Sequence, residues 1–576
     1  MKNISMVAAV LILLIGSACK KSTNNGTLSG TPNPPTGGGN GTATDPATAA
    51  TIGFFMDDWK PKILILPTYN EVPKPTANAT ATVTIDANTI LTKVVPDVYS
   101  HNANSWAGQM VTEPVLMNHL TNLKPNILRF PGGSLSDVYF WNKQYNSPPS
   151  DAPAQLLDAN GAASNANYWG GQTTDAWTIS LNNYYAMLQQ TGNQGMITVN
   201  YGYARYGTGV NPVTNAAHLA ADWVRYDNGR TKYWEIGNEC NGTWEAGYRI
   251  NTVTNADGQP AIITGALYGQ HVKVFVDSMK KAAQEIGKTI YIGTYILEAQ
   301  PAAWQTPTDQ NWNTGVLPVV NTKTDYYIIH SYYTPYQTNA NAATILSTAT
   351  DNTKNMFSFY QTGINSAVNI TKPIALTEYN ITSQGSKQQV SFVNGLHAAI
   401  VVGESIKNKY GMASRWDLVN SYDNGNDHGL FNSGNEPGVT KWNPRPAFYF
   451  LYYFQKYMGD RLLQSNTTGN IIAYSSSFTS GEKATILINK NTTDEIVSIN
   501  LQNATAGARY YWYTLTGGTD NGEFSPKVFV NGDGPTEITG GPSSTYTTIK
   551  ANSATTAGGI KVNVPARAAV YLVMDK

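Results

Sequence analysis

Two glutamates in the sequence follow apolar runs that are typical of β-strands. Glu239 closes the segment that begins at Tyr233, and Glu378 closes the segment that begins at Ile374. Polar residues follow both, so both carboxyl groups can project into one cleft. Two facing carboxyl groups can act as proton donor and nucleophile, which retaining glycoside hydrolysis requires at about 5 to 5.5 Å separation. A carboxyl group kept protonated by apolar surroundings would be the donor, and its ionised partner would attack the anomeric carbon.

Other polar or aromatic residues end neighbouring predicted strands, and we expect them to bind the substrate: Arg129, Asn200, Asn238, His330, Tyr332 and Trp416. A buried ion pair for Arg129 and core packing for Tyr332 are equal alternatives. The long loop after Pro131 carries five aromatic residues, each of which could either stack on a sugar ring or pack against the fold: Tyr139, Trp141, Tyr145, Tyr168 and Trp169.

Eight short β-rich runs alternate with helical stretches and would supply the strands that position these residues. They are Val95–Tyr99, Asn126–Phe130, Met196–Asn200, Thr231–Ile236, Thr289–Thr294, Asp325–His330, Pro373–Thr377 and Ala413–Trp416. One intervening stretch places Tyr268, Val272, Phe275, Val276 and Met279 on a single helical face. This alternation predicts an α/β fold with a (β/α)8 TIM barrel over residues 95–457, with the reactive groups at the carboxyl ends of its strands.

Helical periodicity stops after the last predicted helix, and residues 458–576 predict a C-terminal antiparallel β-sandwich. Its expected strands are Ile471–Ser475, Lys483–Ile488, Ile496–Leu501, Ala508–Thr514, Ser544–Ile549 and Gly559–Val564. The alternating run Ala81–Ile85 lies before the barrel and could add a strand. We therefore assign residues 51–94 to a segment that contributes to the sandwich.

Several motifs resemble those of clan A glycoside hydrolases. The run from Trp234 to Glu239 looks like their strand-4 Asn-Glu signature, and the run from Thr377 to Asn380 resembles their strand-7 nucleophile segment. Three further segments narrow the resemblance to family 51, the α-L-arabinofuranosidases. They are the Arg-Phe-Pro-Gly-Gly run at Arg129, the stretch from Gly237 to Trp244 and the run that begins at His330. The resemblance covers roughly residues 80–576.

The resemblance implies roles for individual residues. Glu239 would be the general acid/base and Glu378 the nucleophile, while Asn238 would bond the sugar hydroxyl beside the reacting carbon. Tyr332 would hydrogen-bond Glu378, and Arg129 would keep that carboxylate ionised. Two substrate-binding positions depart from the family, because Ser134 stands where Asn is usual and Asn104 where Glu is usual. The reaction type is therefore better supported than the sugar.

The composition excludes several other classes of protein. The 576 residues contain 38 Lys and Arg against 38 Asp and Glu, and only 13% are charged, so no basic surface for nucleic acid is expected.

No cofactor and no metal site is expected, because proton transfer and carboxylate attack suffice. We predict a polysaccharide or oligosaccharide substrate of plant or algal origin. A β-xylosidase, an endo-glycanase and a non-catalytic surface glycan-binding lipoprotein remain alternatives.

The N-terminus predicts an export signal. Lys2 precedes an apolar run up to Ile15, and small residues then lead to Cys19. This arrangement resembles the lipobox of bacterial lipoproteins, in which the cysteine is lipidated, although an ordinary secretory signal remains possible. We predict a signal peptide over residues 1–18, followed by the lipidated cysteine and a flexible linker over 19–50. The protein would then be an exported bacterial lipoprotein of the cell envelope, held at a membrane only by its lipid.

This hypothesis predicts that Cys19→Ala abolishes incorporation of radioactive palmitate in a bacterial host, because the acylated thiol is lost. The variant should also move from the membrane fraction to the soluble fraction. Cys240→Ala removes the only other thiol and should keep the label. Equal labelling of Cys19→Ala and the unchanged protein would contradict the lipid anchor.

Overall fold

The computed structural model describes residues 43–364 and 368–576. The predicted signal peptide, Cys19 and most of the predicted linker lie outside these ranges. Within them, no helix is both long enough and apolar enough to cross a membrane. In the last residues of the predicted linker, Asp45 forms a 2.5 Å ion pair with Arg461.

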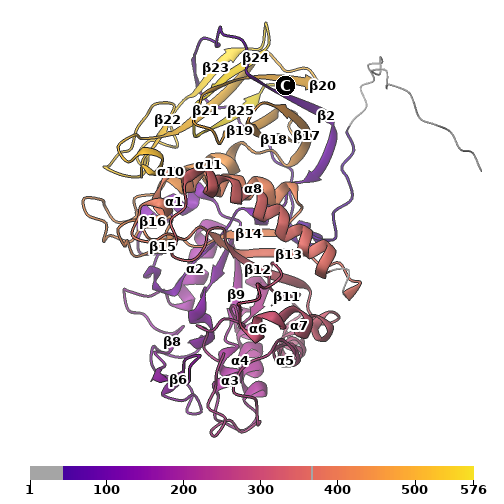
Figure 1. Cartoon of the computed structure of the whole chain (residues 1–576), viewed down its shortest axis with the longest axis vertical. Helices are drawn as coiled ribbons and strands as arrows, with labels where there is room; N and C mark the ends of the chain where they lie inside the picture. Colours follow the sequence, from indigo (N-terminus) through magenta and orange to yellow (C-terminus); the bar gives the residue numbers. More distant parts are fainter. Residues whose placement is uncertain (1–42, 365–367) are drawn as a thin grey trace, which may run out of the picture. The chain divides into compact units, whose positions relative to one another are not determined.

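Eight parallel strands close into a barrel, which lies below the yellow C-terminal strands in Figure 1. In the order around the barrel they are β10 (Thr231–Ile236), β11 (Tyr291–Tyr295), β12 (Tyr326–Tyr332), β13 (Ile374–Asn380), β14 (Met412–Arg415), β3 (Ser100–Asn102), β4 (Ile127–Phe130) and β9 (Gln194–Val199). The helices after these strands include α1 (Pro114–Leu123), α2 (Leu181–Thr191), α3 (Gly202–Tyr206), α4 (Pro212–Asp227), α5 (Gly265–Glu285), α6 (Pro307–Gln310), α7 (Trp312–Val320), α8 (Ala342–Phe359), α10 (Phe392–Lys407) and α11 (Pro446–Tyr457). The predicted (β/α)8 barrel is confirmed.

The local sequence explains where the long helices begin. Ser180, Thr264, Asn341 and Ser391 precede α2, α5, α8 and α10, and each side chain accepts a hydrogen bond from a backbone amide of the first turn. Such caps satisfy donors that have no partner inside the helix. The predicted apolar face of α5 is buried against the barrel.

The first predicted strand, Val95–Tyr99, is wrong. Pro96–Val98 forms a 3₁₀ turn, and the strand begins only at Ser100. Pro96 has a fixed φ and no amide hydrogen, so it suits the start of a turn better than a central strand.

The chain before the barrel covers the amino-terminal ends of three strands. Phe54 stacks on Tyr291 with ring centroids 3.8 Å apart, and Phe55 lies 5.0 Å from Tyr233 and 5.4 Å from Tyr326. Phe55 is 1% exposed. These aromatic contacts close the end of the barrel opposite the predicted active site.

The remaining strands form a β-sandwich built from one long sheet that folds over on itself. The sheet order is β1 (Tyr69–Glu71), β23 (Ala551–Thr555), β21 (Arg509–Gly517), β25 (Ala568–Met574), β19 (Lys483–Asn489), β18 (Ile471–Ser477), β17 (Arg461–Thr468), β2 (Ala81–Lys93), β20 (Glu495–Gln502) and β24 (Ile560–Val564), and β22 (Val528–Val530) pairs with β21. Val83 of β2 and Val570 of β25 share one buried core. The predicted C-terminal sandwich is confirmed.

One predicted strand of the sandwich is wrong. Residues 544–549 form hydrogen-bonded turns, in which Tyr546 and Ile549 donate backbone hydrogen bonds to Pro542 and Thr545. The Pro-Ser-Ser-Thr sequence at this point favours turns over a ladder, because its side chains and its proline compete with strand pairing.

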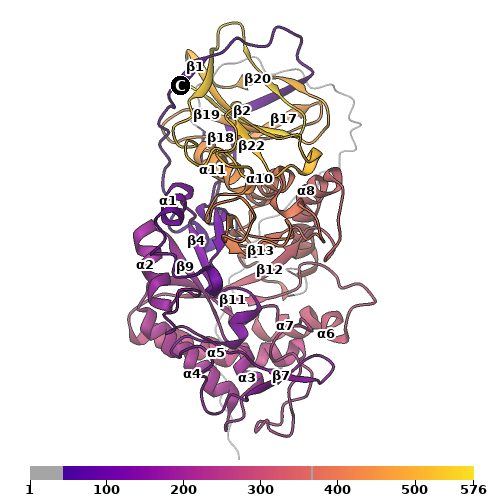
Figure 2. The same ribbon diagram turned by 90° about the vertical axis from the view of Figure 1, so that its left-hand side faces the viewer.

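Helices α10 and α11 lie between the barrel strands and the sandwich in both views (Figures 1 and 2). The hydroxyl of Tyr571 in β25 donates to the carbonyl of Phe450 at 2.8 Å, and that of Tyr474 in β18 donates to Glu404 at 3.0 Å. Alternate residues of β25 face the sandwich core and these helices, so β25 is buried on both faces.

The aromatic contacts of Phe55 at the end of the barrel predict a large loss of stability for Phe55→Ala. Removing a buried phenylalanine ring leaves a cavity and should lower the free energy of unfolding by about 3 to 5 kcal/mol. Urea unfolding followed by tryptophan fluorescence measures this change. Val253→Ala is the control, because that side chain is 91% exposed and should change stability by less than about 0.5 kcal/mol. Equal stability of the two variants would show that the ring does not close the barrel.

Candidate active site

The guanidinium of Arg129 lies inside the barrel and joins three residues from three strands with one residue of the loop after β10. Its Nε donates to Glu235 at 2.5 Å, and Nη1 donates to Asn102 at 2.9 Å and to Glu378 at 2.8 Å. Its Nη2 donates to the side-chain oxygen of Asn238 at 2.9 Å. Arg129 is fully buried, so this cation depends on the two carboxylates for its charge balance.

The two predicted carboxyl groups have different hydrogen-bond partners. Glu378 accepts from Arg129 and also from the hydroxyl of Tyr332 at 3.0 Å. Glu239 bonds the Nδ1 atom of His330 at 2.8 Å, and the Nε2 atom of this ring bonds Thr377 at 3.0 Å. The structure therefore brings Arg129, His330 and Tyr332 to the carboxyl pair.

Glu239 and Glu378 face each other across the mouth of the barrel. A carboxylate oxygen of each lies within 4.8 Å of the other and of a His330 nitrogen. This spacing is close to the value of about 5 to 5.5 Å for retaining hydrolysis, and it is below the 6.5 to 9.5 Å or so that an inverting pair needs for its water.

Unusual backbone conformations place Glu239 at the mouth. Gly237 ends β10 with φ +72°, and a Cβ there would come within 2.5 Å of the Cys240 sulfur and 2.6 Å of Tyr201. Glu239 itself has φ +40°. A non-glycine residue in this region is strained, and such strain is concentrated at functional sites. Cys240 is buried as a packing residue beneath this turn.

The cluster has perturbed pKa values. Burial favours a neutral His330 ring, yet the carboxylates of Glu378 and Glu239 raise the pKa of His330 above its ordinary value. Burial and repulsion from Glu239 raise the pKa of Glu378, although His330 and Arg129 oppose this. Burial would also raise the pKa of Glu239, but the hydrogen bond and charge of His330 lower it overall. For the two carboxyl groups, these directions are opposite to those that the implied roles require.

Asn238 is held by residues that the sequence did not single out. Its side-chain amide donates to Glu245 at 2.9 Å, and its backbone amide donates to Asp137 at 3.1 Å. Ser134 donates to the same oxygen of Glu245 at 2.7 Å. Glu245 lies in an irregular loop seven residues beyond Asn238, so no strand-end pattern marks it. Its burial raises its pKa well above the ordinary range.

Asn200, Asn104 and Trp416 do not contact the carboxyl pair. The Asn200 amide donates to the carbonyl of Tyr139 at 3.2 Å, and its oxygen accepts from the backbone of Tyr203 at 2.9 Å. The side-chain amide of Asn104 donates to Asp417. These loop contacts occupy both polar atoms of the Asn200 amide, whereas the side-chain oxygen of Asn104 is buried without a hydrogen-bond partner among the described residues.

The ring of Trp416 covers the Pro-Gly-Gly turn. A Cβ at Gly133 would come within 2.5 Å of the indole, so the glycine allows the close approach. Trp416 also packs against Trp106, with ring centroids 6.0 Å apart. Its exposed fraction is 8%.

Most of the aromatic residues that we considered as stacking platforms in the loop after β4 are packing residues. Tyr139, Trp141 and Tyr168 are buried, and the rings of Tyr139 and Trp141 stack on Trp223 of α4. Their apolar area is therefore used to hold the loop on the barrel.

The trio Glu239, His330 and Glu378 could also offer three ligand atoms to a metal ion. In the structure His330 already bonds Glu239, and Arg129 supplies a positive charge to Glu378. A divalent cation would meet the guanidinium at close range, so the donor set suits proton transfer better than metal binding.

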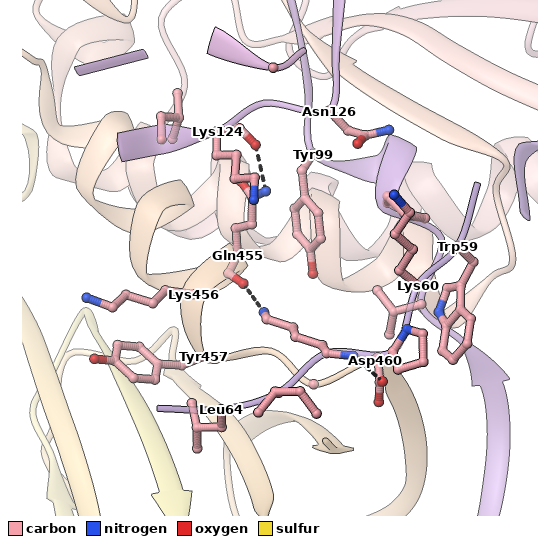
Figure 3. A pocket seen from close by; sticks show the side chains of 18 of the residues that line it. Trp59, Lys60, Leu64, Tyr99, Lys124, Asn126, Gln455, Lys456, Tyr457 and Asp460 are labelled. Carbon is pink, nitrogen blue, oxygen red and sulfur yellow. Dashed lines mark hydrogen bonds between the residues drawn. The ribbon is translucent and has the colours of Figure 1, made fainter. Parts of the chain in front are cut away.

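A separate cavity of about 750 Å³ lies beside the chain segment that precedes β2 (Figure 3). The half-buried Lys62 ammonium donates there to the carbonyl of Met458 at 2.6 Å, and desolvation lowers its pKa to about 7. The cavity's carboxylates, Asp58 and Asp460, bond Lys232 and the Lys62 backbone amide, respectively. Among the described residues that line it, no two free carboxyl groups face each other.

Residues 119–350 match the family model of the alpha-L-arabinofuranosidase 1 domain. A search of curated proteins finds no match.

Solved structures share the fold at low sequence identity. The α-L-arabinofuranosidase from Thermotoga maritima, solved as an arabinose complex, has a TM-score of 0.59 and is 15% identical over 86% of this chain and 99% of its own. A bifunctional glucanase-xylanase from a metagenome library has a TM-score of 0.55 at 15% identity, over 87% of this chain and 100% of its own. A Paenibacillus polymyxa xyloglucanase of family 44 has a TM-score of 0.53 at 12% identity, over 87% of this chain and 100% of its own.

The family match covers β4 and β9 to β12, with Arg129 and the Glu239 turn, and it supports a glycoside hydrolase. The solved structures share the fold of the barrel and the sandwich. The resemblance to clan A glycoside hydrolases, closest to family 51 of the α-L-arabinofuranosidases, is confirmed.

Proposed function

We propose that the protein is a retaining glycoside hydrolase, most similar to the α-L-arabinofuranosidases, that acts on a polysaccharide or oligosaccharide. The observation that carries the proposal is the pair of carboxyl groups, Glu239 and Glu378, whose oxygens approach within 4.8 Å. A pair at this distance can reach one anomeric carbon from two sides and leaves little room for an inverting water.

In the proposed reaction, Glu378 attacks the anomeric carbon while Glu239 gives its proton to the departing glycosidic oxygen. A water then enters, Glu239 takes its proton, and the bond between the sugar and Glu378 breaks. Asn238 is held at the side of this pair by Arg129 and Glu245. A hydrogen bond from Asn238 to a sugar hydroxyl that strengthens in the transition state would lower the barrier.

The hydrogen bonds favour a proton on Glu239 when the substrate binds. Arg129 and the Tyr332 hydroxyl both donate to Glu378, which stabilises its ionised form. The hydrogen bond between His330 and Glu239 works in either direction, because Nδ1 can accept when Nε2 donates to Thr377. A sugar that displaces water from Glu239 would remove the solvation of its ionised form and so favour its protonated form.

The identity of the sugar follows less directly from the site. Ser134 and Asn104 depart from the arabinofuranosidase pattern, and their side chains bond Glu245 and Asp417. This observation keeps a β-xylosidase or an endo-glycanase as the second candidate. We also propose that the protein is an exported lipoprotein, on the strength of Cys19 and the run before it.

The central experiment compares Glu239→Ala and Glu378→Ala with the unchanged protein on arabinofuranosyl, xylosyl, galactosyl and glucosyl aryl glycosides. Glu378→Ala should abolish release, because no nucleophile remains. Glu239→Ala should lose about 10²- to 10⁴-fold on poor leaving groups and less on good ones, and azide should rescue it. Proton NMR of the first product should show retained anomeric configuration.

Glu285→Ala is the matched control, because this glutamate lies on the surface of α5 and pairs with Arg225. It should keep full activity. Equal activity of all the proteins would contradict the assignment, whereas glycan binding without turnover in any protein would favour the glycan-binding alternative.

The Arg129 cluster predicts a pH-dependent loss of stability for Arg129→Leu. At pH 7 the variant buries Glu378 without its cation, which should cost about 3 to 5 kcal/mol in urea unfolding. The pKa of Glu378 in the folded variant then lies further above its unfolded value of about 4.3. The penalty is therefore full above the pKa of Glu378 in the folded variant, shrinks as the pH falls below that value, and is lost below about 4.3, where the carboxyl group is protonated in both states.

Arg225→Leu is the control for this measurement, because it removes an exposed ion pair with Asp222 and Glu285. Its cost should stay within about 1 kcal/mol. A penalty for Arg129→Leu that is small, or that stays unchanged between pH 7 and pH 3.5, would show that the cation does not balance Glu378.

A further inference from the structure

The most exposed aromatic side chains of the described residues lie on the catalytic face. Among tryptophans and tyrosines, the four largest exposed fractions belong to Trp304 (86%), Tyr336 (80%), Trp244 (66%) and Trp177 (44%). Each follows a barrel strand and precedes the next long helix, so all four lie on loops at the carboxyl ends of strands. Single exposed aromatics need no explanation, but several on one face indicate a binding surface.

Three of these residues lie on consecutive loops. Trp244, Trp304 and Tyr336 follow β10, β11 and β12, and these strands are hydrogen-bonded neighbours in the barrel. Trp177 follows β4, which β9 separates from β10. Its ring packs against Tyr145 and Trp169, with centroids 5.1 and 5.5 Å away, whereas the other three make no such ring contacts among the described residues.

Trp244 connects this row of aromatics to the chemistry. Its side chain hydrogen-bonds Glu239, the group that gives its proton to the departing oxygen in the proposed reaction. A Cβ on Gly242 would come within 2.6 Å of the indole, so the ring lies close over this glycine. The indole is therefore positioned on one side and open to solvent over two-thirds of its surface.

The geometry points to Trp244, Trp304 and Tyr336 as stacking platforms for the leaving-group side of a saccharide chain. The substrate class would then be a neutral oligosaccharide or polysaccharide with several sugar units beyond the cleaved bond. This inference rests on the proposed function, because Glu239 defines the leaving-group side. The apolar faces of sugar rings suit flat aromatic rings, and the proton donor at β10 places the departing chain over β10 to β12.

The test uses two measurements on the full chain. First, kcat/KM is measured on an aryl glycoside and on soluble arabinan, xylan and xyloglucan, for the unchanged protein, Trp304→Ala, Tyr336→Ala, Gly242→Ala and Trp177→Ala. Second, affinity electrophoresis in gels that contain the same polysaccharides measures binding by Glu378→Gln, alone and with each change. The binding readout needs no turnover.

We expect the polymer-to-aryl ratio of kcat/KM to fall about 2- to 13-fold for each lost platform, which corresponds to about 0.5 to 1.5 kcal/mol per aromatic contact. Gel retardation should weaken in parallel. Gly242→Ala should act in the same direction by displacing Trp244, whereas Trp177→Ala should change the ratio by less than twofold. Unfolding curves of each variant should match those of the unchanged protein.

Three outcomes would overturn the inference. The ratio could stay constant in all variants of a protein that still hydrolyses the aryl glycoside, which would leave the proposed function intact. None of the polysaccharides could retard Glu378→Gln. The unchanged protein could self-associate in a concentration-dependent way that Trp304→Ala abolishes, which would assign the aromatics to an interface between copies. Loss of the proposed function would instead appear as absence of aryl glycoside hydrolysis in the unchanged protein.

Discussion

The site depends on one buried cation. Arg129 lies on β4, and its guanidinium bonds Asn102 of β3, Glu235 of β10 and Glu378 of β13, besides Asn238 just after β10. A buried guanidinium is tolerated only when its charge and its donors are matched. The same contacts that satisfy this requirement fix the relative positions of strands from three sides of the barrel. The alignment of these side chains across the barrel therefore depends on a single charge balance.

The surrounding acids exceed the available positive charge. Asp137, Glu235, Glu239, Glu245 and Glu378 lie within this network, and among the described residues that bond them only Arg129 and His330 can carry positive charge. Burial raises the pKa of Asp137 to about 7, although three backbone amides donate to its carboxylate. An excess of buried carboxyl groups keeps some of them protonated near neutral pH. A proton donor at the mouth of the barrel is compatible with this balance, because ionising every acid would leave uncompensated negative charge.

Sequence reasoning located the residues whose positions follow from strand ends. Glu239, Glu378, Arg129, Asn238, His330 and Tyr332 meet because parallel strands in a barrel bring their carboxyl ends together. The same rule included Asn200, whose amide is used by local loop contacts, and it could not find Glu245, which lies in a loop without periodicity. Tyr139 and Trp141 were considered as ligand platforms, but their rings pack on α4. Loop side chains depend on tertiary contacts that no spacing encodes, whereas strand ends depend on the alternation itself.

The site has two parts. The charged residues Arg129, Glu239 and Glu378 form its floor, and the exposed Trp244, Trp304 and Tyr336 form its rim. These two parts face different physical demands. A neutral sugar offers little charge for recognition, while the transition state develops charge that preorganised groups can stabilise. In the proposed reaction, the floor could therefore act on any sugar whose anomeric carbon lies between Glu239 and Glu378. The rim has to supply the area and shape that distinguish one chain from another, and loops tolerate change better than strands. A fold shared with an arabinofuranosidase, a glucanase-xylanase and a xyloglucanase is compatible with this division, because one barrel can carry different activities when the loops around its site differ.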